Sequence, residues 1–178
     1  APDDRFGSNN YMKLDYMNGR FSAGLQIDAY LPALQGYEIG QQPGAYHFYL
    51  SSKYIQWQDH NYSVRVGDIF DQFGSGLIFR SFEDRQLGFN NSIEGVQGIY
   101  RFGDYVEVKG MYGRPRLYTD YADSWVRGAD LHISLNDIFG WNAAQFSAEG
   151  SYVNRYESLD KDQTLSLIHI SEPTRLRR

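Results

Sequence analysis

Residues 11–31 read YMKLDYMNGRFSAGLQIDAYL and contain the clearest two-residue alternation in the chain. Apolar and polar residues alternate on both sides of Asn18-Gly19, a dipeptide that suits the positive φ angles of a tight hairpin turn. Folding the stretch about this dipeptide places Leu14 opposite Ala23. Both strands then direct their apolar side chains to one face and their polar side chains to the other. The stretch therefore predicts an antiparallel hairpin with one apolar face.

The same alternation continues along the chain. Folding about residues 58–61 places Ile55 opposite Val64, and folding about 101–105 places Tyr100 opposite Val106. Period-two alternation is typical of strands that have one apolar and one polar face. We therefore predict an all-β fold, an antiparallel meander of about eight long strands, at residues 11–17, 20–31, 46–58, 62–70, 92–100, 105–113, 125–135 and 143–155.

The predicted connections are alternately short and long. Residues 18–19, 59–61 and 101–104 form short connections, whereas the connections at 32–45 and 71–91 are long. Short turns at one end and long loops at the other are typical of outer-membrane β-barrels. Several strands also approach the ~9–11 residues that a tilted strand needs to cross a bilayer. This pattern indicates that the sheet is part of a transmembrane outer-membrane β-barrel.

Hydropathy and aromatic residues agree with this interpretation. The chain contains no apolar run of about 18 residues and therefore no candidate transmembrane helix, and its mean hydropathy is −0.56. Barrel strands are hydrophilic on average because lipid-facing and lumen-facing residues alternate. Tyr and Trp near strand ends suit the aromatic girdles at the two membrane interfaces. These girdle candidates are Tyr11, Tyr16, Tyr30, Trp57, Tyr62, Tyr100, Tyr105, Tyr112, Trp125, Trp141 and Tyr152.

Composition and motifs argue against several classes of function. The net charge of −5 is unsuited to a general nucleic-acid binder, and the absence of cysteine excludes disulfides and thiolate metal sites. The histidines at 47, 60 and 132 have no metal-type spacing. Ser75 lies in FGSGL, which lacks the Gly-x-Ser-x-Gly spacing of a nucleophile elbow. We therefore expect no enzymatic activity and no metal or other cofactor.

Charged residues supply the candidate functional positions. An Arg on the lipid face near mid-bilayer costs ~2–4 kcal/mol, so charges within a barrel belong in the wet lumen. There they either set selectivity or bind a small polar solute, or they pair with one another and brace the barrel. Both hypotheses are open at this point. The candidate lumen-lining residues are Arg65, Arg80, Asp84, Arg85, Glu107, Lys109, Arg114, Arg116, Arg127 and Asp130.

Several segments carry a family resemblance. They are residues 1–29, 66–77 (VGDIFDQFGSGL), 82–85 (FEDR), 112–116 (YGRPR), 126–130 (VRGAD) and 150–156 (GSYVNRY). Together they resemble a family of uncharacterised Bacteroidetes proteins that are thought to be outer-membrane β-barrels and carry a domain-of-unknown-function label. The resemblance implies a place in the outer membrane of a Gram-negative bacterium, in contact with lipid, and members with further strands. It implies no specific activity.

The two ends of the chain differ in character. Residues 165–175 read LSLIHISEPTR, which resembles the translation of an adapter used to prepare DNA sequencing libraries. The alternative is a genuine basic tail that follows a short apolar strand. We predict that residues 1–164 are a fragment of an outer-membrane β-barrel domain and that 165–178 are a non-native tail.

Two functions are consistent with these patterns. The first is an outer-membrane barrel that passes or binds a polar solute in a charged, porin-like lumen. The alternative is a secreted, soluble β-sandwich that binds carbohydrate through exposed aromatic residues such as Tyr37, Tyr46, Trp57 and Trp141. The many small residues on the apolar face would make a thin sandwich core, but they fit well against lipid. The sequence therefore favours the barrel.

Overall fold

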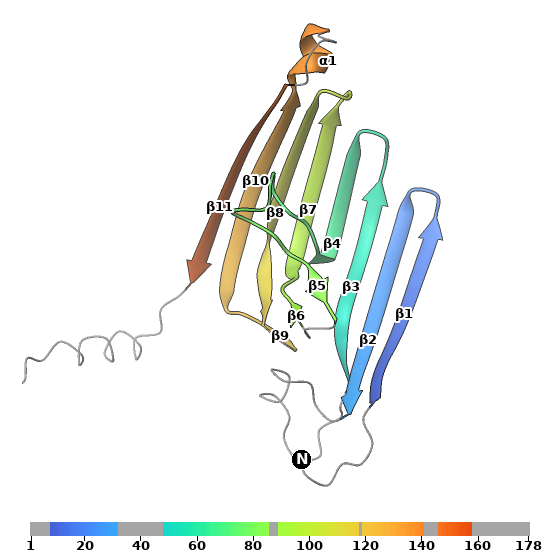
Figure 1. Ribbon diagram of the computed structural model, residues 1–178. Helices are drawn as coiled ribbons and strands as arrows, with labels where there is room; N and C mark the ends of the chain where they lie inside the picture. The colour runs from blue at the N-terminus through green and yellow to red at the C-terminus, as the bar shows by residue number, and fades with distance from the viewer. Residues whose placement is uncertain (1–7, 32–47, 86–88, 118, 141–145, 158–178) are drawn as a thin grey trace, which may run out of the picture.

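Eight long strands form one antiparallel sheet (Figure 1). The computed structural model describes residues 8–31, 48–85, 89–117, 119–140 and 146–157. Each long strand pairs with the next long strand along the chain, so the predicted all-β antiparallel meander is confirmed. The long strands are β1 (Ser8–Asn18), β2 (Phe21–Leu31), β3 (Phe48–Gln58), β4 (Tyr62–Ile69), β7 (Ile93–Phe102), β8 (Val106–Leu117), β10 (Ser124–Ser134) and β11 (Ser147–Glu157).

The described residues also contain four short elements. The strands β5 (Glu83–Asp84) and β6 (Phe89–Asn90) pair with each other, and β9 (Asp120–Tyr121) pairs with the end of β8. The helix α1 (Leu135–Phe139) follows β10 directly and ends at Gly140, whose φ is +64°. The alternation did not predict this helix, and residue 135 was expected to lie in a strand.

The connections at the two ends of the sheet differ in length. The tight turns and α1 lie at one end, and the connections that contain β5, β6 and β9 lie at the other (Figure 1). Among the described residues, β1 and β11 each pair with a single strand. The sheet is therefore open at both edges, and these residues do not form a closed barrel.

The hairpin registers differ from the sequence prediction by two residues. Leu14 pairs with Leu25 rather than with Ala23, and the β3–β4 and β7–β8 hairpins are shifted by the same amount. In the first hairpin the turn is centred on Gly19-Arg20, and Gly19 supplies the positive φ of +57°. A shift of two residues keeps every side chain on its predicted face, because the strand period is two.

The two faces of the sheet differ in burial in an unusual way. The apolar face is exposed along the whole sheet, and no described segment covers it. The polar face contains the buried side chains, Asp28 and Gln97 among them. Exposed side chains of the apolar face are Leu14, Leu25, Ile55, Val64, Val66, Val96, Val108 and Leu131.

A small apolar core lies on the polar face, where the chain between β4 and β7 folds back over the sheet. Its members are Ile69, Phe73, Phe79, Ile93, Met111 and Val126, with Val153 packed against them. Phe73 and Phe79 come from the segment between the strands. This segment therefore packs on the sheet as an insertion.

Candidate functional site

The inserted hairpin (residues 71–81) is the first part of the site. The backbone N–H of Phe73 donates to the carbonyl oxygen of Phe79 at 3.1 Å. The backbone N–H of Ser81 donates to the backbone carbonyl oxygen of Asp71 at 2.8 Å. Gly74 and Gly76 take positive φ angles of 49° and 80° and form the reversal. These backbone hydrogen bonds pair the two ends of the segment and close it into a hairpin.

Phe73 holds the inserted hairpin on the sheet. Its side chain is 1% exposed, and its ring centroid lies 4.9 Å from that of Phe79. The ring lies directly on Gly128 of β10, because a Cβ added at Gly128 would be 2.5 Å from Phe73 Cε2. The close approach of the hairpin to the sheet therefore depends on a glycine at this position.

Asp71 adds a polar anchor to the hairpin. Its carboxylate accepts hydrogen bonds from Gln97 Nε2 and from Lys109 Nζ, the latter at 3.3 Å. The Lys109 ammonium also lies 3.7 Å from Glu107, which forms a 2.7 Å ion pair with Arg101. Carboxylates and cations thus alternate across β7 and β8 beneath the hairpin.

The chain after the hairpin covers the polar face of β2. Gln26 Nε2 donates to Asp28 at 3.1 Å and to Glu83 at 3.2 Å, and Arg85 Nη2 donates to Gln26 Oε1 at 2.9 Å. The Arg85 guanidinium also lies 5.1 Å from the centre of the Tyr11 ring. Gln26 and Asp28 are buried here, and their polar groups are satisfied by one another and by the insertion.

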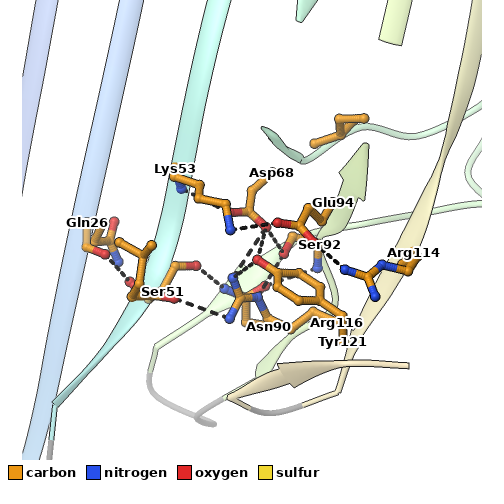
Figure 2. Close-up of polar contacts among 12 residues, drawn as sticks. Gln26, Ser51, Lys53, Asp68, Asn90, Ser92, Glu94, Arg114, Arg116 and Tyr121 are labelled. Carbon is orange, nitrogen blue, oxygen red and sulfur yellow. Dashed lines mark hydrogen bonds and ion pairs between the residues drawn. The ribbon is translucent and has the colours of Figure 1, made fainter. Parts of the chain in front are cut away.

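A buried network joins the strand ends on the side of the long connections (Figure 2). Asp68, which is fully buried, accepts hydrogen bonds from Ser92 Oγ (3.1 Å), Arg116 Nη2 (3.3 Å) and the Tyr121 hydroxyl (3.2 Å). Arg116 also donates to the Tyr121 hydroxyl and reaches the carbonyl oxygen of Leu50. We call Asp68, Ser92, Arg116 and Tyr121 the rim network. It joins the ends of β3, β4, β7, β8 and β9.

Tyr121 is the least polar member of the rim network. Burial raises the pKa of its hydroxyl, and the Arg116 guanidinium partly offsets this rise. The ring lies 4.8 Å from the Arg116 guanidinium and 5.2 Å from the Lys53 ammonium. The Tyr121 hydroxyl is therefore neutral at physiological pH and both accepts and donates a hydrogen bond.

A second group of charges lies at the margin of the apolar face (Figure 2). Lys53 Nζ lies 2.6 Å from Glu94 Oε1, and Arg114 Nη2 lies 3.1 Å from Glu94 Oε2. Arg114 pairs with Glu94 across β7 and β8, two residues beyond Tyr112 on the same face. We call Lys53, Glu94 and Arg114 the charged row.

The structure divides the ten predicted site residues among three places. Four lie on the polar face of the sheet: Arg65, Glu107, Lys109 and Asp130. Three lie in the insertion that packs on this face: Arg80, Asp84 and Arg85. The other three lie elsewhere: Arg114, Arg116 and Arg127. The ten residues therefore do not form one cluster.

The three residues that lie elsewhere do not share the polar face with the other candidates, and their lumen-lining role stays a prediction. Arg127 pairs with Tyr112 and shares the apolar face with Ala129, where its Nε donates to Asn154 at 3.2 Å. Arg114 lies at the margin of that same face. Arg116 is buried in the rim network. In each case the strand alternation or the rim geometry determines where the charged side chain lies.

Pairing dominates among the residues of the polar face. Arg65 Nε donates to the carbonyl oxygen of Asp68, and its guanidinium lies 4.0 Å from the Tyr54 ring. Asp130 accepts a 2.6 Å hydrogen bond from Ser151. Arg80 differs, because it is exposed on the inserted hairpin and stacks on the Phe82 ring at 4.9 Å. Most of the predicted residues are therefore paired with neighbouring groups.

Sequence reasoning missed several residues that shape the site. Phe73 and Gly128 make the central contact of the hairpin, and Asp71 anchors it, yet none belongs to an alternating pattern. The local signal for the hairpin is the pair of glycines at 74 and 76, since glycine suits a bend of the chain. Contacts between distant segments leave no periodic trace in one sequence.

Neither a metal-binding cluster nor a membrane-spanning helix is found among the described residues. In that part of the chain, no three His, Asp or Glu side chains group as a metal site would require. No helix found there is long and apolar enough to cross a membrane.

Sequence comparison places the chain in a family. Residues 1–175 match the sequence profile of a family of unknown function, DUF6029. The matched range includes residues 165–175, whose adapter origin stays a prediction and which lie outside the described residues. Neither a curated protein nor a solved structure matches the chain. The match covers nearly the whole sequence, and the chain therefore belongs to the DUF6029 family.

Proposed function

We propose that the sheet is part of the wall of an outer-membrane β-barrel in a Gram-negative, Bacteroidetes-like bacterium. In this proposal the apolar face contacts lipid and the polar face lines a wet lumen. The observation that carries the proposal is the pattern of burial: aliphatic side chains of one face are exposed, whereas Asp28, Gln97 and Asp130 of the other face are buried. A soluble protein would bury the aliphatic face. A membrane protein exposes it to lipid and keeps polar groups inside.

Strand length supports the proposal. β1, β2, β3, β10 and β11 each contain 11 residues. At about 3.3 Å per residue such a strand is about 36 Å long, and a tilt of about 40° reduces its height to about 28 Å. This height matches an apolar band of about 25 Å. Strands of a soluble sandwich are typically about half as long.

Aromatic residues border the apolar face on both sides, as interface girdles would. Near the tight turns they are Tyr16, Phe21, Trp57, Tyr62 and Tyr100, and near the long connections they are Phe48, Tyr112, Trp125 and Tyr156. The Tyr112 and Trp125 rings stack at 4.9 Å. Two predicted girdle residues, Tyr11 and Tyr30, lie on the polar face instead, and Trp141 is outside the described residues.

The insertion indicates the kind of lumen. Eight-stranded barrels have an interior that side chains alone fill. The inserted hairpin would need additional room on the polar face, so we infer a barrel of more than eight strands in which the hairpin narrows the lumen. Passage or binding of a small polar solute is the role that such a lumen supports, with the exposed Arg80 beside its path.

The carbohydrate-binding sandwich receives less support. Of its aromatic candidates, Tyr37, Tyr46 and Trp141 lie outside the described residues, and Trp57 lies on the apolar face between Phe21 and Val64. A sandwich would also require a second sheet on that face, and the described residues supply none. It is kept as the outcome expected if the membrane test fails.

Heat-modifiable gel migration of the complete gene product tests the proposal. We would express the gene with a signal sequence in a Gram-negative host, isolate outer membranes and extract them with carbonate. The proposal predicts retention in the membrane pellet and a shift in gel migration on boiling. Release into the soluble fraction without a heat shift would refute it, and glycan binding would then be measured.

A further inference from the structure

A groove of about 510 Å³ runs along the apolar face over β1 to β4. Its lining is mainly apolar and includes Leu14, Ala23, Leu25, Ile55 and Val66. Ala23 lies opposite Tyr16 on β1 and Ile55 on β3, so a small side chain separates larger ones at this point. The shape and the chemistry of the groove fit a flexible hydrocarbon chain.

The charged row lies where this groove ends. Lys53 lines the groove and also pairs with Glu94, which Arg114 contacts from the other side. Two cations therefore share one carboxylate, and the row has one excess positive charge. The side chains of Lys53 and Arg114 are 41% and 39% exposed, so both cations have donors available to a further anion.

We propose that the groove and the charged row together bind one phosphate-bearing membrane lipid. An acyl chain would lie along Leu25, Ile55 and Val66, and the phosphate would lie against Lys53 and Arg114. The apolar tail of such a lipid matches the apolar groove, and its anionic headgroup matches the cations of the charged row beside it. This inference rests on the proposed membrane location, because only there does the apolar face meet lipid.

Lipid retention measured by native mass spectrometry tests the inference. The protein, first shown to be heat-modifiable, is purified in detergent and titrated with phosphatidylglycerol. Lys53→Gln and Arg114→Gln should each weaken binding about fivefold, which corresponds to about 1 kcal/mol for one basic residue near an anionic headgroup. Glu94→Gln should strengthen binding, because it removes the competing carboxylate. Ala23→Leu should weaken it by filling the groove.

Lys13→Gln is the matched control. Lys13 makes an exposed ion pair with Asp15 at 3.4 Å, but it lies on the opposite face of the sheet. Binding should be unchanged in this variant. An equal loss in Lys13→Gln and Lys53→Gln would refute a specific site, since it would show an effect of net charge alone.

Two further probes separate the parts of the ligand. Diacylglycerol supplies the acyl chains without phosphate, and inorganic phosphate supplies the anion without a chain. Binding of either one as tight as that of phosphatidylglycerol would overturn the inference. If the protein is heat-modifiable but the variants bind lipid equally, only this inference fails. If the protein does not enter the membrane, the proposed function fails, and this inference fails with it.

Discussion

Replacing Gly128 with Ala should loosen the inserted hairpin. The added Cβ would lie 2.5 Å from Phe73 Cε2, 3.1 Å from Phe73 Cζ and 3.3 Å from the carbonyl oxygen of Tyr152. Favourable carbon contacts are about 3.5–4.0 Å long, so the ring must move. Phe73 is 1% exposed and packs against Phe79, so the ring has no free space on the hairpin side.

The expected cost follows from overpacking. Forcing an extra carbon into a filled site typically destabilises a protein by about 1–3 kcal/mol. Truncation of the ring in Phe73→Ala should cost about 3–5 kcal/mol, because it empties the centre of the core. If Gly128→Ala destabilises the protein only through its clash with the Phe73 ring, the double variant Gly128→Ala/Phe73→Ala should be no less stable than Phe73→Ala alone. The two changes are therefore predicted to be strongly non-additive.

Urea unfolding in lipid vesicles, followed by heat-modifiable gel migration, measures these stabilities. Trypsin cleavage after Arg80 reports separately on the hairpin and should be faster in Gly128→Ala. The control is Gly110→Ala on the neighbouring strand β8, where an added Cβ would meet nothing within 4 Å. Equal stability and equal cleavage in the two alanine variants would refute the packing account.

Three further outcomes are expected. Val66→Arg, on the apolar face, should lower the free energy of unfolding in vesicles by about 2–4 kcal/mol, measured by the same urea assay. Arg116→Ala should cost about 3–5 kcal/mol because it leaves the Asp68 carboxylate buried without its cation, whereas the exposed Arg114→Ala should cost under about 1 kcal/mol. Arg80→Ala should shift the reversal potential in a planar bilayer, and Arg114→Ala, on the opposite face, should leave it unchanged.

The strands and their faces could be predicted because alternation is a local property. Leu14 and Leu25 both belong to the apolar face whichever residue of that face each one meets. The register could not be predicted so well, because it depends on where the turn is centred. The sequence predicted a turn centred on Asn18-Gly19, but the chain turns at Gly19-Arg20. This change moves each strand of the hairpin by one residue relative to the prediction. Because the pairing is shifted by two residues in total, each side chain stays on its predicted face of the sheet.

The site was less accessible to sequence reasoning than the fold. The contact of Phe73 with Gly128 and the pairing of Asp68 with Arg116 join segments far apart in the chain. No local pattern indicates such contacts. Arg127 is different, since the alternation that assigns Ala129 to the apolar face also assigns Arg127 there. Its choice as a lumen-lining candidate followed from charge alone, whereas the register of β10 places it on the apolar face.

If the sheet is the wall of a barrel, neighbouring residues of one strand face lipid and water in turn. Leu131 and His132 on β10 test this alternation, because they lie on opposite faces, with Leu131 38% and the His132 side chain 42% exposed. The chain has no cysteine, so Leu131→Cys and His132→Cys each give a single spin-labelled site. In lipid vesicles, the spin label at position 131 should be accessible to oxygen and inaccessible to a water-soluble nickel complex. The spin label at position 132 should show the reverse. Equal access of the nickel complex to both positions would contradict the account.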